Sequence, residues 1–255
     1  MNKNFIKIEA AGCRYDMSIR YRSVSKALVV FIHGLGCSQN SFEDVWRHKD
    51  FKGTSLLTFD LLGFGRSEKP ADFSYSMEDH AAVCESVVRS FPHKRFHVVA
   101  HSMGAAIGLL FSDNMFDSVI SFVNVEGNLI SEDCGLVSRQ TTAVSYDRFE
   151  GELLPYLKTR SREEAPCFDL NMALPLAFYK SAQSLVAWSE SGRLLERFKN
   201  LKCRKAYFYG EQNSGMKVFQ RLGGVERRSI RHSGHFMMNE NPEAFYSELR
   251  DFLSI

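Results

Sequence analysis

The chain has 255 residues, of which 44% are hydrophobic and 24% are charged, and this composition excludes the disordered, collagen-like and low-complexity classes. The 32 Lys and Arg residues nearly balance the 30 Asp and Glu residues. The resulting net charge of +2 argues against a nucleic-acid binder that works by neutralising phosphates. Because α/β architectures of this size commonly form one core, we expect a single domain with an insertion.

The N-terminal segment and the apolar runs do not predict a secreted or membrane-spanning chain. Apolar character at the N-terminus ends after Phe5 and Ile6, which is too short for a signal peptide. The longest clean apolar run, residues 27–32, is far short of the roughly 20 residues that a spanning helix needs. Six cysteines without a close C-x-x-C pair favour a reduced chain over a disulfide or zinc framework. We therefore expect a cytoplasmic protein without a membrane span.

The predicted elements begin with a β-hairpin at residues 5–10 and 13–21, two alternating segments that flank Ala11-Gly12. Short runs rich in β-branched and aromatic residues follow, and such runs are typical of a parallel sheet covered on both faces. These strands are expected at residues 27–32, 55–59, 96–100 and 119–125, with later strands at 205–209 and 225–230. The fold class is therefore α/β.

Two helices have clear start signals. Apolar residues recur at helical spacing from residue 77 to residue 90, behind a Ser76 cap that has Asp79 three residues later. Asn241-Pro242-Glu243 is typical of the start of a final helix, with Asn as the cap and Pro in the first turn. Both helices are expected to belong to the main core.

Strand character disappears between residues 126 and 204, where helical patterning is interrupted by prolines. We expect a core of residues 1–127 and 193–255 and a helical cap of residues 128–192. The aromatic side chains of the cap could cover an apolar cleft, or they could pack the interior of the cap itself. The large apolar residues considered are Tyr146, Phe149, Tyr156, Phe168, Leu174, Phe178, Tyr179 and Trp188.

A candidate nucleophile lies where the strand at 96–100 runs into His101-Ser102-Met103-Gly104 and then a helix. A strand-to-helix turn exposes the serine hydroxyl and directs the first N–H groups of the helix toward any negative charge beside it. The turn is tight, so its flanking residues must be small, as Ala100 and Gly104 are. One element can thus supply both a nucleophile and half of an oxyanion hole.

Together with three further motifs, this turn resembles the α/β-hydrolase superfamily over nearly the whole chain except the insertion. His33-Gly34-Leu35-Gly36 resembles the oxyanion loop of that family, residues 60–67 resemble its loop after the next strand, and Ser233-Gly234-His235-Phe236 resembles its catalytic-histidine loop. One departure is Ala100, which replaces the first Gly of G-x-S-x-G. The resemblance implies a mostly parallel central sheet with helices on both faces and a small helical cap.

The resemblance also implies roles for individual residues. Ser102 would be the nucleophile, His235 the base, and the N–H groups of Leu35 and Met103 the oxyanion hole. The neighbouring His101 is expected to serve packing or solvent contact. Serine at the nucleophile position argues against an epoxide hydrolase or a dehalogenase, which would carry Asp there.

The acid of the triad is the point at which the chain departs from the commonest family pattern. Most relatives carry Asp in a G-x-x-D turn after the next-to-last strand, where this chain has Gly210-Glu211-Gln212-Asn213. A subset carries the acid at the end of the strand after the nucleophile helix, and Glu126 ends that strand here. We therefore prefer Glu126. Asn213 is a weak candidate, because its amide cannot stabilise an imidazolium by charge. The alternatives to Glu126 are Glu211, a nearby acid such as Asp133, or no acid.

These residues predict a serine hydrolase that cleaves a carboxylic ester of a small to medium, mostly apolar substrate through an acyl-enzyme. Phe149, Phe178 and Trp188 of the cap are the expected substrate contacts. No cofactor, metal or nucleic-acid partner is expected, and the oligomeric state is left open. The alternatives are a non-catalytic ligand-binding protein on the same fold, or, among enzymes, a thioesterase or a carbon–carbon bond hydrolase.

Overall fold

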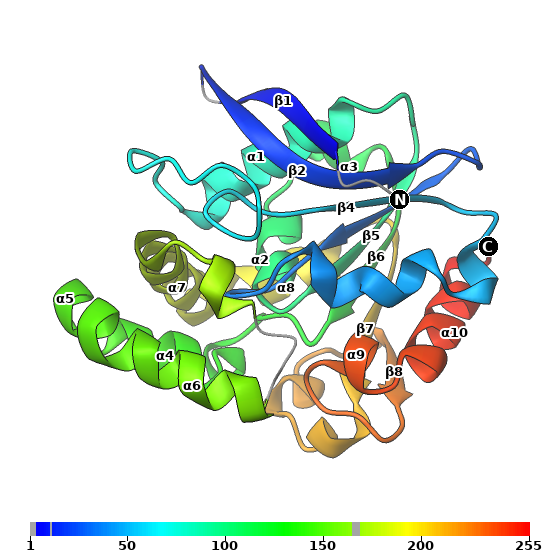
Figure 1. Ribbon diagram of the computed structural model, residues 1–255. Coiled ribbons are helices and arrows are strands. Elements are labelled where there is room, and N and C mark those ends of the chain that lie inside the picture. Colours follow the sequence, from blue (N-terminus) through cyan, green and yellow to red (C-terminus); the bar gives the residue numbers. More distant parts are fainter. Residues whose placement is uncertain (1–3, 11, 165–168) are drawn as a thin grey trace.

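The computed structural model describes residues 4–10, 12–164 and 169–255, and in them the chain forms an eight-stranded sheet of order β1-β2-β4-β3-β5-β6-β7-β8 (Figure 1). The strand pairs β1–β2 and β2–β4 are antiparallel, and every later pair is parallel. The strands are β1 (Asn4–Ala10), β2 (Cys13–Arg22), β3 (Leu28–Ile32), β4 (Ser55–Phe59), β5 (Phe96–His101), β6 (Val119–Val125), β7 (Arg204–Gly210) and β8 (Glu226–Ile230). The predicted fold class, hairpin and strands are confirmed.

The central strands are buried on both faces of the sheet, which explains their continuous apolar sequences. Along β3, Leu28, Val30 and Ile32 pack into the apolar cluster on one face, whereas Val29 and Phe31 pack into the cluster on the other. Side chains alternate between the two faces of a strand, so an uninterrupted apolar run requires a covering layer on each side.

Helices supply both layers. The larger apolar cluster includes residues of α1 (Met77–Arg89), α2 (Met103–Leu109), α3 (Asp113–Phe116), α7 (Pro175–Glu190) and α8 (Arg193–Asn200). The second cluster includes residues of η1 (Gln39–Trp46), η2 (Lys49–Phe51), α9 (Met237–Glu240) and α10 (Pro242–Leu253). In Figure 1, α10 and α1 accordingly lie on different sides of the sheet.

Side-chain hydrogen bonds cap both helices at the expected starts. Ser76 Oγ accepts a hydrogen bond from Asp79 N–H at 3.1 Å, and α1 ends at Arg89 rather than at the expected Ser90. Asn241 Oδ1 accepts from Ala244 N–H at 3.3 Å at the start of α10. Both caps satisfy N–H groups that the first turn of a helix leaves without a partner.

The described part of segment 128–192 is helical. It contains η3 (Ser131–Asp133), α4 (Leu136–Thr142), α5 (Tyr146–Arg148), η4 (Phe149–Leu153), α6 (Leu154–Glu164), η5 (Leu170–Met172) and α7. Helix α7 contacts α1, α2 and α8 as well as α4, so the apolar interior of this segment is continuous with the main core. Phe168 lies outside the described residues.

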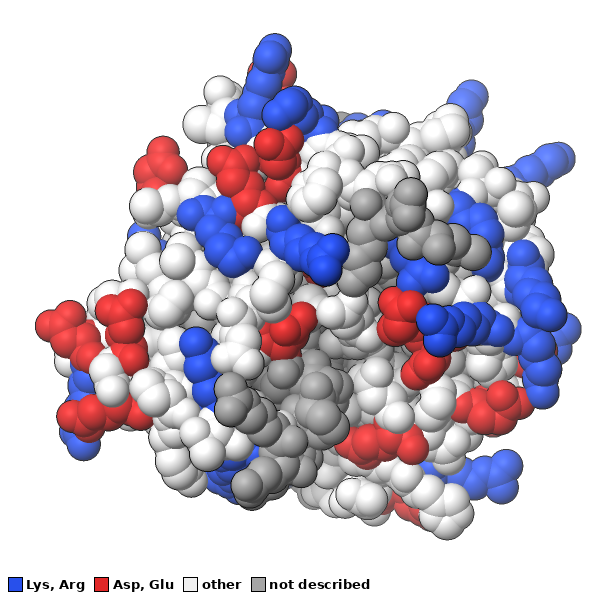
Figure 2. All heavy atoms as spheres, in the orientation of Figure 1, with Lys and Arg blue, Asp and Glu red and all other residues white. Residues whose placement is uncertain are grey.

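Two further features bear on function. Figure 2 shows acidic and basic side chains interspersed over one face of the molecule, in keeping with the net charge of +2. In the described ranges, no helix has both the length and the apolar character needed to cross a membrane.

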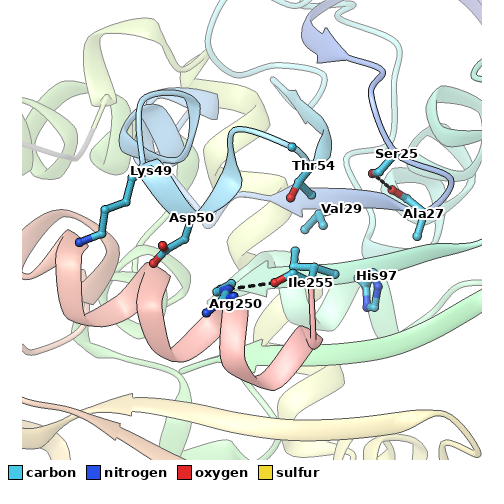
Figure 3. A pocket seen from close by; sticks show the side chains of 10 residues that line it. Ser25, Ala27, Val29, Lys49, Asp50, Thr54, His97, Arg250 and Ile255 are labelled. Carbon is cyan, nitrogen blue, oxygen red and sulfur yellow. Dashed lines mark hydrogen bonds between the residues drawn. The ribbon is translucent and has the colours of Figure 1, made fainter.

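A cavity of about 560 Å³ lies near the beginnings of β3 and β5, lined by Val29, Lys49, His97, Arg250 and Ile255 among others (Figure 3). Ser102 directly follows the opposite, C-terminal end of β5. This cavity is therefore separate from the predicted nucleophile.

Candidate active site

Ser102 occupies the tight turn between β5 and α2, as expected. Its backbone has φ 51° and ψ −123°, a conformation that is rare for residues other than glycine, and its N–H donates to the carbonyl of Val125 at 3.1 Å. A Cβ on Gly104 would lie 2.4 Å from the carbonyl oxygen of Ile32, so only glycine fits where the turn passes the end of β3. The turn is thus held against both neighbouring strands.

His235 and Glu126 meet at the same edge of the sheet. Glu126 follows β6, His235 lies in the loop after β8, and the Nδ1 atom of His235 is 2.9 Å from Oε2 of Glu126. The His235 side chain is 40% exposed, whereas that of Glu126 is 2% exposed. Because the carboxyl ends of parallel strands share one edge, residues 109 positions apart become neighbours.

The Glu126 carboxylate has two further donors. Gly210 N–H donates to Oε1 at 2.8 Å, and the side-chain amide of Asn213 donates to Oε1 and Oε2 at 2.9 Å each. Burial alone would raise the pKa of Glu126, but the hydrogen bonds from His235, Asn213 and Gly210 outweigh it and lower that pKa below its usual value. Glu126 is therefore an ionised, oriented acceptor for the imidazole.

The other acids considered do not reach the imidazole. Glu211 Oε2 accepts from the main-chain N–H of His232 at 3.0 Å. Asp133 Oδ2 accepts from the N–H groups of Leu129 and Ile130, and burial raises the pKa of Asp133 to about 6. Among the described residues, neither carboxylate is hydrogen-bonded to His235.

The main chain around His235 is held by two side chains that the sequence analysis did not assign to the site. The carbonyl of His235 accepts from Nε2–H of His101 at 3.0 Å. The carboxylate of Glu240 accepts from the N–H groups of Gly234 and Phe236. Hydrogen bonds therefore hold the main chain at His235 itself, through its carbonyl, and at both neighbouring residues, through their N–H groups.

His101 is fully buried, and desolvation lowers its pKa well below the usual value. It is therefore neutral, and donation to a carbonyl requires its proton on Nε2. Its ring centroid lies 4.6 Å from that of His235. The sequence predicts packing or solvent contact for His101, and it does not indicate the hydrogen bond to the His235 carbonyl. Nothing local in the sequence identifies a partner 134 residues away.

The loop at residues 33–36 lies directly beside Ser102. A Cβ on Gly34 would lie 3.0 Å from Ser102 Cβ and 3.1 Å from His101 Nδ1, so glycine permits this close approach. His33 is fully buried; its Nδ1–H donates to the Gly34 carbonyl at 2.9 Å, and its Nε2 accepts from Leu61 N–H at 3.0 Å. Burial lowers the pKa of His33, which favours the neutral form that these two bonds require.

The N–H groups of Leu35 and Met103, the predicted oxyanion donors, make no hydrogen bond to any described residue. The first N–H groups of a helix lack an intrahelical partner, so that of Met103 remains able to bind an anion. From segment 128–192, Asp169 N–H donates to the Gly36 carbonyl at 2.9 Å, and its carboxylate accepts from Ser38 Oγ–H at 2.8 Å. This segment therefore contacts the loop that carries Leu35.

The three predicted substrate contacts occupy different surroundings. Phe149 and Phe178 are fully buried and stack on each other, with ring centroids 5.5 Å apart and planes inclined by 17°. The guanidinium of Arg193 lies 4.5 Å above the ring of Trp188. Because Phe149 and Phe178 are fully buried, direct contact with a substrate would require a rearrangement of the residues around them, and all three assignments stay predictions.

Known proteins share this fold and part of the sequence. The chain is 47% identical over 83 residues, or 32% of its length, to a probable lysophospholipase, BODYGUARD 4 of Arabidopsis thaliana, but the match spans only 20% of that protein. An esterase from Exiguobacterium antarcticum superposes with a TM-score of 0.79 at 17% identity, over 98% of this chain and 99% of that chain. A thermophilic esterase from Thermogutta terrifontis superposes with a TM-score of 0.80 at 15% identity, over 98% of each. The family model described as the alpha/beta hydrolase fold matches residues 27–242, and the chain belongs to that family.

Proposed function

We propose that this protein is a serine hydrolase that cleaves carboxylic esters through an acyl-enzyme. The observation that carries the proposal is the 2.9 Å bond between His235 Nδ1 and a buried Glu126, beside the strained turn of Ser102. A hydroxyl is a poor nucleophile at its own pKa, so it needs a base oriented by a third group. Serine, imidazole and carboxylate supply these roles.

In the first half-reaction, Ser102 Oγ attacks the ester carbonyl while Nε2 of His235 takes the hydroxyl proton. The oxyanion that forms is stabilised by the N–H groups of Leu35 and Met103, and Glu126 stabilises the imidazolium. When the tetrahedral intermediate collapses, the C–O bond to the alcohol breaks and His235 protonates the leaving oxygen. Ser102 is left acylated.

In the second half-reaction, His235 removes a proton from water, whose oxygen attacks the acyl carbon. Collapse of the second tetrahedral intermediate releases the carboxylic acid and returns the proton to Ser102 Oγ. Every proton transfer passes through Nε2, because Nδ1 is engaged with Glu126. The proposed steps use the three side chains, the two main-chain N–H groups and water.

We assign residues 128–192 to a cap over this site and residues 1–127 and 193–255 to the core. The contacts of Asp169 with Gly36 and of Leu174 N–H with the Gly63 carbonyl, at 2.8 Å, support a cap that closes over the loops at the sheet edge. The proposed substrate is small to medium and mostly apolar, and the ring of Trp188, which is only partly buried, supports an apolar contact. The probable lysophospholipase and esterase relatives also support ester chemistry.

The decisive test is turnover combined with labelling of Ser102. Purified protein should hydrolyse p-nitrophenyl acetate, butyrate and octanoate, and a fluorophosphonate should label wild type but not Ser102→Ala. Absence of both turnover and labelling would leave the ligand-binding alternative. Faster cleavage of matched thioesters or diketones would reassign the reaction within the enzyme class.

Substrate polarity is tested separately with matched neutral and anionic acyl groups. A preference for neutral esters is expected. A preference for anionic esters that is lost in Arg139→Gln or Arg148→Gln would contradict the apolar assignment, although in the structure these arginines pair with Glu190 and Glu152.

A further inference from the structure

Asn213 lies in the short turn after β7, η6 (Glu211–Asn213), with its side chain directed at Glu126. Its Nδ2 atom is 2.9 Å from Oε1 and 2.9 Å from Oε2. A side-chain amide carries no net charge, and one of its N–H groups can point between two carboxylate oxygens, so it can bind both without altering the charge of the site.

The three hydrogen-bond donors to Glu126 bind different oxygens of its carboxylate. Oε1 accepts from Gly210 N–H and Asn213, whereas Oε2 accepts from Asn213 and His235. A single hydrogen bond from Gly210 N–H would fix the position of Oε1 but would let the plane of the carboxylate rotate about that oxygen. Asn213 contacts both oxygens, so it fixes the plane and directs Oε2 toward the imidazole.

We propose that Asn213 is a positioning residue, which holds the Glu126 carboxylate in the plane that His235 Nδ1 requires. This inference rests on the proposed function, because it assigns a further residue to the same site. Asn213 touches no reacting atom and acts only through Glu126. Its contribution appears when the imidazolium forms, the step at which a correctly placed carboxylate matters most.

The neutrality of Asn213 is part of this role. An aspartate at the same position would have the same shape, but it would place an acceptor oxygen where the amide places its donor Nδ2. Two carboxylates at hydrogen-bond distance do not both ionise readily, so one would hold a proton or leave extra negative charge beside His235. The amide avoids this conflict while it orients the acid.

The experiment compares Asn213→Leu, which removes both donors at similar size, with Gln220→Leu, which removes an exposed amide from the neighbouring turn. With p-nitrophenyl butyrate, Asn213→Leu should lower kcat by roughly 10- to 100-fold with KM nearly unchanged, the effect of losing a hydrogen bond to a charged group. Gln220→Leu should leave both constants unchanged. Thermal melts show whether each variant is folded.

The pH profile separates positioning from a merely structural role. Without the amide donors, the negative charge of Glu126 is less compensated and favours the imidazolium, so the acid limb of kcat/KM should move to higher pH. Asn213→Asp, which preserves shape, should move the limb in the same direction. The other titratable side chains that contact the loop around His235, namely His101, Glu211 and Glu240, are unchanged in all these variants.

A readout without turnover distinguishes failure of this inference from failure of the proposed function. In a Ser102→Ala background, the downfield NMR resonance of His235 Nδ1–H should be sharp in the parent and in Gln220→Leu but broadened by exchange in Asn213→Leu. An unchanged resonance together with an unmoved acid limb overturns the positioning role, even if kcat falls. A wild type without turnover or labelling overturns the proposed function alone.

Discussion

The Nε2 atom of His101 lies 3.0 Å from the main-chain oxygen of His235, so the residue before the proposed nucleophile holds the main chain of the proposed base. His101 ends β5 at the centre of the sheet, where it is fully buried. The loop after β8 includes exposed residues, and this bond connects it to a fully buried strand. A small displacement of a proton-transfer group has a large kinetic effect, since the reacting atoms must be aligned closely.

Replacing His101 with Leu should therefore lower kcat by roughly 10- to 100-fold with little change in KM, because the His235 carbonyl loses its buried donor. His101→Gln retains a side-chain N–H and should recover most of the activity. Steady-state kinetics on p-nitrophenyl butyrate measure both. Equal activity of the two variants would show that the donor has no role in placing the base.

Replacing Glu126 with Gln should lower kcat by roughly 10³- to 10⁴-fold, because the amide cannot stabilise the imidazolium and favours the wrong tautomer. Glu211→Gln should retain near-normal kcat, since the Glu211 carboxylate is hydrogen-bonded to the main chain of His232 and the amide still offers an oxygen acceptor. The pair is compared in the same assay. The opposite result, loss in Glu211→Gln alone, would assign the acid to Glu211.

Replacing Phe178 with Ala should reduce the free energy of unfolding by about 3–5 kcal/mol, as expected for loss of a fully buried phenyl ring. Phe5→Ala is the control, because that side chain belongs to a residue that is 57% exposed. Urea denaturation measures both. A loss below about 1 kcal/mol in Phe178→Ala would contradict its place in the stacked pair with Phe149.

Acid should destabilise the protein through His80. Desolvation lowers its pKa in the native state to about 3, whereas the unfolded chain binds a proton near pH 6.5. The contribution of His80 to the free energy of unfolding is complete above pH 6.5. It decreases by about 1.4 kcal/mol per pH unit as the pH falls from 6.5 toward 3. Burial also lowers the pKa of His97, to about 4, which adds a second contribution of the same sign.

The contribution of His80 is isolated by the variant His80→Gln. Between pH 6 and 4.5, its free energy of unfolding should depend less steeply on pH than that of wild type. The difference in slope should correspond to about one proton bound on unfolding. The difference in slope does not depend on how much the substitution destabilises the protein at neutral pH. Parallel slopes for the two proteins would show that His80 titrates in the native state.

Local sequence patterns were sufficient for the strands and for the helix starts. The apolar run of β3 predicted a buried central strand because a strand covered on both faces has no place for alternating polar residues. Ser76 predicted the start of α1 because its side chain binds an N–H only three residues away. Such features depend on neighbours in the chain, so sequence alone determines them.

Aromatic content did not distinguish the two possible roles of the aromatic residues in segment 128–192. The same phenyl rings suit an apolar cleft and an apolar interior, and only the packing of η4 against α7 places Phe149 and Phe178 on each other. Tyr146 shows the same point, because its ring packs edge-on against Tyr179 of α7. Composition measures how much apolar surface exists and does not say what covers it.

By itself, the sequence predicted the strands and the turn that carries Ser102, and it placed Glu126 at a strand end while leaving Glu211 and Asp133 as alternative acids. The tertiary structure decided which atoms meet: Glu126 with His235, Asn213 with Glu126, and His101 with the His235 carbonyl. Each of these contacts joins residues more than 80 positions apart, whose approach depends on the order of strands in the sheet. A local pattern specifies the ends of single strands, but only the assembled sheet edge specifies which of those ends are neighbours.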